Sequence, residues 1–213
     1  RVDLILNASI AFDWKDISPT IFGAVFESTL NPETRHQGGM HYTSIENIHK
    51  VIDPLFLDDL KAELAEIEGL KVEKTRRLRL RRFQEKLASI SVFDPACGSG
   101  NFLTESFLSL RTLETRVLES LQGEQMGFGF DGDADPIKVG INQFYGIEIN
   151  DFAVSVAKTA LWIAEEQMME ATQEILYCDL DFLPLKSNSN ICEGNALRID
   201  WSEVLPPEEC AYV

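Results

Sequence analysis

A nine-residue string, DPACGSGNF at positions 94–102, constrains the fold of this 213-residue chain more than any other feature. It follows the short apolar run 90–93 and precedes a helical pattern that continues to about Leu121. Gly98 and Gly100 permit a tight turn and a close approach of the backbone to a ligand. A turn that needs glycine only for its dihedral angles would account for a bare Gly-x-Gly, but not for the whole string. The string therefore predicts a strand, a ligand-binding turn and a helix in direct succession.

The same order of strand and helix recurs further along the chain. Residues 144–149 have the pattern of a second strand, and the helix after them can be capped by Asp151. A third strand is expected over 190–195 and the beginning of a fourth over 210–213, whereas 122–142 is a connection rich in Gly and Asp. Strands that alternate with helices predict an α/β fold, a partial Rossmann-like sheet with right-handed crossovers.

Helical patterns dominate the chain before residue 90. Ser18 and Pro19 indicate the cap and the first position of a short helix. Thr43 and Glu46 have the spacing of a capping box, and Pro54 is expected to end or bend the helix that they begin.

Residues 57–87 then predict one or two charged amphipathic helices. We therefore divide the chain into an N-terminal helical region, 1–89, and the first half of a Rossmann-like domain, 90–213.

The charge balance argues against a freestanding nucleic-acid-binding protein. The chain has 35 acidic and 19 basic residues, a net charge of −16, whereas affinity for a duplex rests largely on basic side chains. One segment, Lys71 to Lys86, is strongly basic, with Glu73 and Glu85 as its only acids. We favour its pairing with the acidic stretch Asp58 to Glu68 over a weak contact with DNA phosphates, and both interpretations stay open.

Cysteine, histidine and hydropathy patterns point to a reduced, metal-free and cytoplasmic protein. The four cysteines are widely spaced without a Cys-x-x-Cys pair, and the three histidines, all within 36–49, have no second ligand cluster. No apolar run of about 18 residues or secretion signal is present, so we expect neither a membrane span nor export.

Polar side chains follow each of the first three predicted strands, where ligands of parallel sheets bind. Asp94 offers a carboxylate for an ammonium group, and the helix from Asn101 offers free amides, which suits a zwitterionic ligand. Glu148 can accept the hydroxyls of a ribose, although a surface glutamate in a turn is the alternative. The amide of Asn195 can bind an adenine edge, or simply close a turn. Ile149 and Leu197 could wall such a nucleoside.

The strings DPACGSGNF, GIEIN, GNAL and the upstream GGMHYTS resemble the cofactor motifs of amino-type DNA methyltransferases. The closest resemblance is to large type II restriction-modification enzymes. It implies S-adenosyl-L-methionine as the cofactor, methylation of adenine N6, and a C-terminal recognition domain that contacts double-stranded DNA. By the same resemblance, the HYT element lies over the methionine end of the cofactor. The implied cofactor-binding residues are His41, Tyr42, Thr43, Asp94, Pro95, Ala96, Cys97, Gly98, Gly100, Asn101, Phe102, Glu148, Ile149, Asn195, Ala196 and Leu197.

The chain departs from this family at its C-terminal end. After strand four the family carries an Asn/Asp-Pro-Pro-Tyr/Phe loop that holds the flipped base. The chain stops at Val213, where that loop should begin, and the prolines within 205–208 indicate an ordinary turn. We therefore assign no catalytic residue and expect the chain alone to be inactive.

Three other functions are compatible with parts of the sequence. A methyltransferase of RNA or of protein glutamine would share the same cofactor motifs. A nicotinamide dehydrogenase is disfavoured, because Leu103 occupies the position of the third glycine. A non-catalytic scaffold could contact DNA through Lys71 to Lys86.

Overall fold

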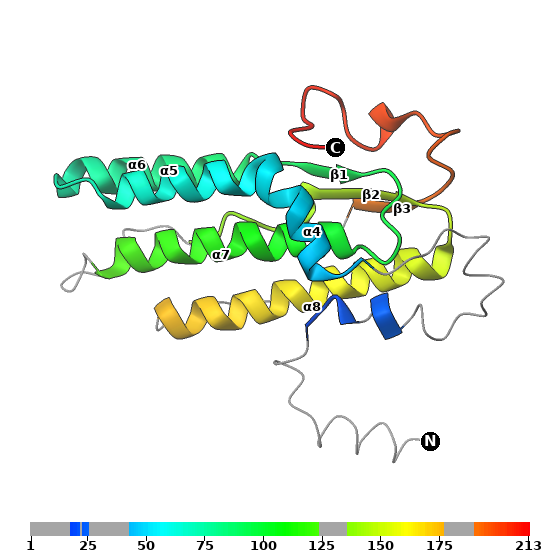
Figure 1. Cartoon of the computed structure of the whole chain (residues 1–213), viewed down its shortest axis with the longest axis horizontal. Coiled ribbons are helices and arrows are strands. Elements are labelled where there is room, and N and C mark those ends of the chain that lie inside the picture. Colours follow the sequence, from blue (N-terminus) through cyan, green and yellow to red (C-terminus); the bar gives the residue numbers. More distant parts are fainter. Residues whose placement is uncertain (1–17, 22, 26–42, 124–135, 177–189) are drawn as a thin grey trace, which may run out of the picture.

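The computed structural model describes residues 18–21, 23–25, 43–123, 136–176 and 190–213. Its sheet has three parallel strands in the order β1 (Val92–Asp94), β2 (Phe144–Glu148) and β3 (Asn190–Glu193). Val92 pairs with Phe144, and Gly146 pairs with Ile191. The parallel α/β arrangement predicted from the sequence is confirmed (Figure 1).

A fourth segment lies beside the other edge of β1. Tyr212 forms a parallel bridge with Val92. The Phe93 N–H donates to the Tyr212 carbonyl at 2.9 Å, and the Tyr212 N–H donates to the Ser91 carbonyl at 3.1 Å. The chain thus runs outward from β1 through β2 to β3 and then returns to the far side of β1. In open parallel sheets, such a reversal of strand order is where ligands bind.

Two long helices make the crossovers between the strands. Helix α7 (Asn101–Gly123) connects β1 to β2, and α8 (Asp151–Leu176) connects β2 to β3. The two helices pack against each other and against the strands that they connect, on one face of the sheet (Figure 1). Residues 194–211 run over the opposite face, where Leu205 packs against Phe93 and Ile147.

The N-terminal helices form an outer layer on α7. Helix α4 (Ile45–Ile52) continues through a π-helical segment, η2 (Asp53–Leu57), into α5 (Asp58–Glu68), and α6 (Glu73–Ala88) runs back beside α5. The bend predicted at Pro54 is present, because Pro54 lies at the start of η2 and α4 and α5 run in different directions (Figure 1). Residues 57–87 form two helices, as expected.

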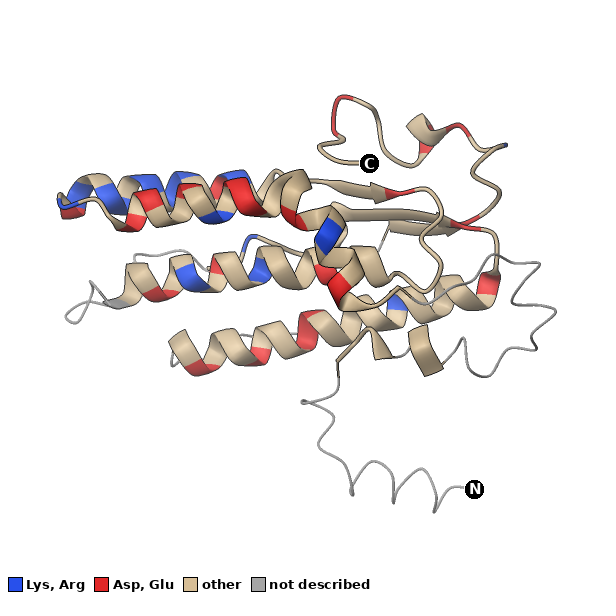
Figure 2. Cartoon of the chain, in the orientation of Figure 1, with Lys and Arg blue, Asp and Glu red and all other residues tan. Residues whose placement is uncertain are grey.

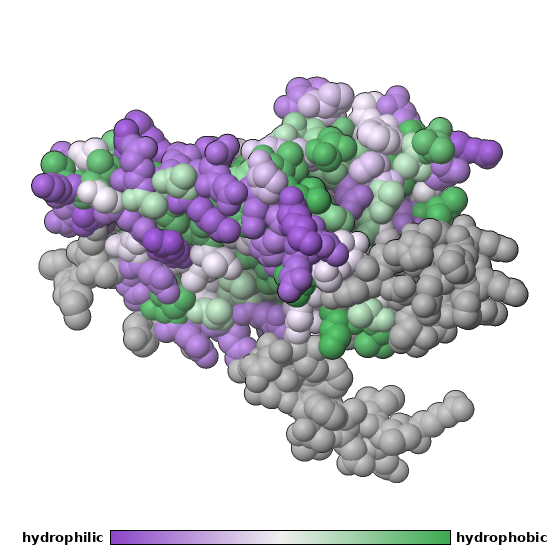
Figure 3. All heavy atoms as spheres, viewed as in Figure 1, coloured by the Kyte–Doolittle hydropathy of each residue, from purple (hydrophilic) through white to green (hydrophobic). Residues whose placement is uncertain are grey.

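Opposite charges line the arm that α5 and α6 form together (Figure 2). Arg79 pairs with Glu66 at 3.0 Å, and Lys86 pairs with Glu63 at 2.6 Å. These contacts confirm the predicted pairing of the basic segment with the acidic stretch for two of its cations. Mostly hydrophilic side chains cover the visible face of this arm (Figure 3).

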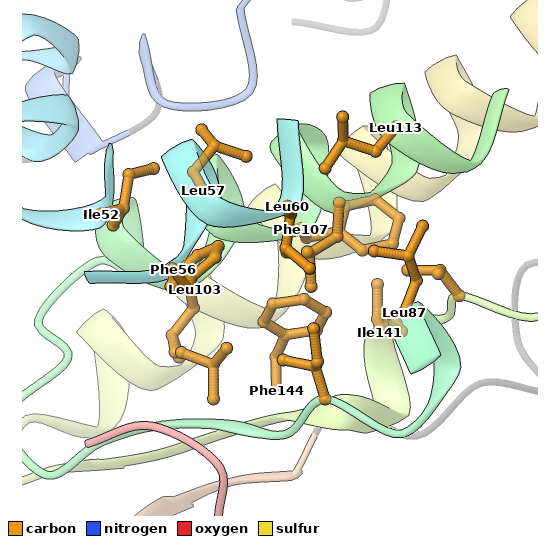
Figure 4. Packing of buried hydrophobic residues seen from close by; sticks show 14 of the residues in the cluster. Ile52, Phe56, Leu57, Leu60, Leu87, Leu103, Phe107, Leu113, Ile141 and Phe144 are labelled. Atoms are coloured by element: carbon orange, nitrogen blue, oxygen red, sulfur yellow. The ribbon is translucent and has the colours of Figure 1, made fainter. Parts of the chain in front are cut away.

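One hydrophobic core joins the outer layer to the sheet. Phe56 and Leu60 from the N-terminal helices lie near Phe107 of α7 and Phe144 of β2 (Figure 4). The rings of Phe107 and Phe144 meet edge to face, with centroids 5.6 Å apart. The apolar stripe of the N-terminal helices is buried along its length, at Ile48, Ile52, Phe56, Leu57, Leu60, Leu64 and Ile67.

Three predicted helix starts are wrong by one or two residues. Ser44, in an extended conformation, precedes α4 in place of Thr43, and it makes no side-chain cap hydrogen bond. Asn150 caps α8 in place of Asp151, because its Oδ1 accepts from the Ala153 N–H at 2.9 Å. Pro19 lies in a turn, and helical conformation begins at Ile21. At α8 the neighbouring Asn150 satisfies the requirement predicted for Asp151, so the sequence pattern alone cannot separate the two.

Within the described residues, no helix is both long and apolar enough to cross a bilayer. The same residues contain no group of three or more His, Cys, Asp and Glu side chains arranged to hold a metal ion.

Candidate functional site

The glycine loop, residues 94–100, leaves the carboxyl end of β1 and leads into α7. Asp94 Oδ1 accepts a hydrogen bond from the Ala96 N–H at 3.0 Å. Gly98 and Gly100 have φ values of 55° and 77°, a left-handed conformation that favours glycine. The Gly100 N–H donates to the Cys97 carbonyl at 2.7 Å, which closes the turn just before α7 begins.

The two glycines of this loop serve different purposes. A Cβ on Gly100 would lie 2.8 Å from the Cβ of Ala157 in α8, so this glycine allows the close packing of α8. A Cβ on Gly98 would meet nothing within 4 Å. Because no described residue packs against the position of a Gly98 side chain, that space can take a ligand.

Glu148, at the end of β2, joins the three stretches that the sequence singled out. Its Oε2 accepts from the Gly98 N–H at 3.0 Å, and its Oε1 accepts from the Asn150 N–H at 2.9 Å. Its backbone carbonyl accepts from the Gly194 N–H at 2.8 Å, at the turn that follows β3. Segments that are about 50 residues apart in sequence thus meet at one glutamate, which is 8% exposed.

The electrostatics of this edge of the sheet favour a cationic ligand. Burial raises the pKa of Asp94, and the negative charge of Glu148 raises it further, against the lowering effect of the Ala96 N–H. Within the described residues, no lysine or arginine forms a salt bridge with either carboxylate. A positively charged ligand would therefore supply the counter-charge that the chain does not.

Cys97 lies in the same loop but does not suit nucleophilic chemistry. Burial raises the pKa of its thiol well above the ordinary value, and the carboxylates of Asp94 and Glu148 raise it further. The thiol is therefore neutral, and the residue, 6% exposed, packs as part of the core. The described cysteines, Cys97, Cys192 and Cys210, are all free.

The stretch after β3 is a compact turn at the same edge of the sheet. Asn195 Oδ1 accepts from the Leu197 N–H at 3.0 Å, so its side chain closes the turn. Leu197 is 93% exposed and Ile149 is 61% exposed, so both apolar side chains are open to a ligand. The Trp201 indole N–H donates to the Ala196 carbonyl at 2.8 Å, and this hydrogen bond holds the turn in place.

The other candidate residues have different surroundings. Ala96 is exposed, Pro95 and Phe102 are half-buried, and Phe102 packs against the main core. Asn101 is 6% exposed, and its Oδ1 has no hydrogen-bond partner among the residues that the structure describes. Thr43 is half-buried before α4. His41 and Tyr42 lie outside the described residues.

One contact of the glycine loop was not foreseen from the sequence. The backbone of Gly23 lies against Ser99 and Asn101. The sequence held only a general signal, an isolated glycine within an apolar helical stretch, which does not say what the glycine contacts.

The domain combines three features: a reversal of strand order, a glycine loop beside it and an acid at the end of the next strand. Together they define a Rossmann-like domain of the methyltransferase class. The chain belongs to the family of MmeI DNA-methyltransferase domains, whose model matches residues 70–212. It is thus a methyltransferase domain of the restriction-modification type.

Two curated relatives cover nearly the whole chain. DNA methyltransferase A of Bacillus subtilis (strain 168) is 39% identical over 209 residues, which are 96% of this chain and 22% of that protein. A putative type II restriction enzyme and methyltransferase of Methanocaldococcus jannaschii is 27% identical over 94% of this chain and 18% of its own length. The chain therefore spans about a fifth of each relative.

A solved structure has the same fold. The type IIL restriction-modification enzyme MmeI, determined in complex with DNA, matches 93% of this chain with a TM-score of 0.82 and 39% identity. The match covers 26% of that protein.

Proposed function

We propose that the chain is the S-adenosyl-L-methionine-binding part of an enzyme that methylates adenine N6 in DNA, within a restriction-modification or related defence system. The observation that carries this proposal is the pair of carboxylates, Asp94 and Glu148, at neighbouring strand ends without a basic salt-bridge partner in the described residues. They lie beside a glycine whose missing side chain leaves open space.

The residues at this edge fit the chemical groups of the cofactor. Asp94 would hold the ammonium group, and the amides at the start of α7, with Thr43 and the HYT element, would face the carboxylate. Glu148 would accept the ribose hydroxyls. Each of its oxygens already accepts one amide, and a carboxylate has about four acceptor positions, so capacity remains. Ile149, Asn195 and Leu197 would surround the adenine.

When bound, the cofactor supplies a methyl group on a sulfonium sulfur. This chain would bind the cofactor and orient its methyl group. Such orientation of the reacting groups supplies a large part of the rate enhancement of a transfer reaction. The chain lends no nucleophile to the reaction from Cys97, because its thiol is buried and neutral.

Calorimetric titration of the purified chain tests the cofactor proposal. We expect one S-adenosylmethionine or S-adenosylhomocysteine molecule to bind per chain, with NADH as the matched nucleotide that does not. Absence of binding to the folded chain, or preference for NADH, would contradict the proposal.

The DNA substrate and the position of methylation concern the whole protein. One relative is named as a DNA methyltransferase and the other as a putative type II restriction enzyme and methyltransferase, and the structural neighbour was solved with DNA. These names support a duplex substrate. We propose that a recognition domain outside this chain makes the main DNA contacts in the cytoplasm, with at most a weak contribution from Lys71 to Lys86. We also propose residues 1–89 and 90–213 as the helical and Rossmann-like regions.

Methylation of duplex DNA by the full-length protein tests these statements. Digestion of the product to nucleosides should yield N6-methyladenine. N4-methylcytosine would correct the target atom, and transfer only to RNA or protein would overturn the substrate class.

A further inference from the structure

The glycine loop is held at three places where a glycine permits close contact. Gly100 of the loop packs on Ala157 of α8. On β2, a Cβ on Gly146 would lie 2.8 Å from Cys97 Sγ, so this strand approaches the loop equally closely. The third contact comes from Gly23, which lies more than 70 residues before the loop. The first two contacts belong to the strand-helix units themselves, whereas the third joins a separate segment to the loop.

The contact at Gly23 leaves no space for a side chain. A Cβ on this residue would lie 2.4 Å from Ser99 Oγ, 2.7 Å from Asn101 Oδ1 and 3.1 Å from Asn101 Nδ2. The Ser99 hydroxyl could turn away by rotation of its side chain. The Asn101 carboxamide has little room to do so, because it is 6% exposed.

Part of the segment that carries Gly23 is buried, whereas Ile21 and Val25 are 45% and 54% exposed. Thr20 is 1% exposed, and its carbonyl accepts from the Gly23 N–H at 3.1 Å. Its hydroxyl bonds to that of Ser18 at 2.8 Å. The segment therefore has an internally bonded turn that can present Gly23 to the loop in a fixed position.

We propose that residues 18–21 and 23–25 form the third support of the glycine loop and that Gly23 is a positioning residue for cofactor binding. This inference rests on the proposed function. Gly23 acts through Ser99 and Asn101, on either side of Gly100. If this support is displaced, the loop can shift, and with it the Gly98 amide that Glu148 holds. Binding groups that must lie within fractions of an ångström of their ligand tolerate little such movement.

Substitution of Gly23 by alanine tests the inference. Overpacking of a close contact is costly, so we expect the Kd of S-adenosylmethionine to rise about tenfold or more in Gly23→Ala. Gly69→Ala, at the end of α5, is the matched control, because a Cβ there would lie 3.5 Å from its nearest neighbours. We expect its Kd to stay within about twofold of the wild-type value.

Hydrogen exchange supplies a readout that does not depend on the cofactor. Amides of the glycine loop should exchange faster in Gly23→Ala without ligand, whereas those of α5 and α6 should keep their wild-type rates. Unchanged loop exchange together with an unchanged Kd would overturn the inference.

A double-mutant cycle with Asn101→Ala distinguishes support from general damage. Because Asn101 Oδ1 has no partner, removal of the carboxamide sacrifices no hydrogen bond at that atom and makes room at position 23. Gly23→Ala should then raise the Kd by a smaller factor in the Asn101→Ala background. An equal factor in both backgrounds would contradict the contact.

Two further outcomes are decisive. If Gly23→Ala does not fold, the double variant must fold and bind about as well as Asn101→Ala alone, and an unfolded double variant would overturn the inference. If the wild-type chain binds no S-adenosylmethionine, the proposed function fails. Normal binding by both wild type and Gly23→Ala removes only the role of Gly23.

Discussion

Two buried glutamates, Glu114 in the middle of α7 and Glu148 at the end of β2, have very different surroundings. Glu114 is fully buried, and it accepts from the Arg111 guanidinium, from Gln84 Nε2 at 2.8 Å and from the Lys138 N–H at 2.7 Å. Glu148 is 8% exposed, and its carboxylate accepts from the backbone amides of Gly98 and Asn150.

The difference separates a structural acid from an acid that can bind a ligand. The partners of Glu114 neutralise its charge and tie α6, α7 and the segment after residue 136 together. Glu148 keeps acceptor capacity and has no basic salt-bridge partner within the described residues. Burial alone would therefore misidentify Glu114 as the functional residue. Spare hydrogen-bonding capacity at the carboxyl edge of the sheet is the better criterion.

The largest expected effect is on stability at Glu114. Glu114→Ala leaves the Arg111 guanidinium, 2% exposed, without its carboxylate, and loss of one partner of a buried ion pair costs about 3–5 kcal/mol. Urea unfolding should show this loss in the free energy of unfolding. Glu119→Ala, an exposed position on the same helix, should change it by less than about 0.5 kcal/mol. Equal stabilities of the two variants would refute a structural role for Glu114.

A smaller effect, on binding, is expected at Glu148. Glu148→Ala should weaken S-adenosylmethionine binding by about 1–3 kcal/mol, because hydrogen bonds to the ribose are lost. Glu193→Ala is the control, since this exposed acid pairs in register with Glu148 at the end of β3. Calorimetry that finds the same affinity for Glu148→Ala and the control would remove Glu148 from the site.

The smallest expected effect is on stability, at His49, whose ring contacts two partly buried acids, Asp53 and Glu105. The ring nitrogens of His49 lie 2.9 Å from Asp53 Oδ1 and 3.0 Å from Glu105 Oε1. Hydrogen bonding to Asp53 raises the pKa of His49, against the lowering effect of burial, and hydrogen bonding to Glu105 raises it further. The hydrogen bond with His49 lowers the pKa of Asp53. Both carboxylates thus favour the imidazolium.

The pKa of His49 is higher in the folded than in the unfolded chain. Its contribution to the free energy of unfolding is therefore fully present below the unfolded pKa, about 6.5. It is lost as the pH rises through the folded pKa. The lowered pKa of Asp53 has the opposite sign, so its contribution is lost as the pH falls through the folded value. We expect His49→Gln to remove less than about 1 kcal/mol near pH 6 and progressively less at higher pH. A loss that grows with pH would refute this bridge.

Much of the fold and of the candidate site could be predicted from local patterns. The strand ends, the glycine loop and Glu148 follow from apolar runs, each with a polar residue at its carboxyl end, and the parallel topology brings them together. Other features depend on tertiary packing. Arg111 and Glu114, three residues apart, have the spacing of a surface ion pair on a helix, and only the fold shows that they are buried. The contact between Gly23 and Asn101 joins segments that no local pattern relates.

The π-helical segment η2, which begins around Pro54, determines how the side chains of α5 are rotated about the helix axis relative to those of α4. The buried side chains from Ile48 to Leu64 recur at every fourth residue, and on a regular α-helix such a row would wind about 160° around the axis over this length. The π-helical segment η2 has more residues per turn, so it unwinds part of that rotation. Both helices can then keep the same row of side chains against α7. The π-helical turn at Pro54 thus lets α4 and α5, which run in different directions (Figure 1), share one buried row of apolar side chains.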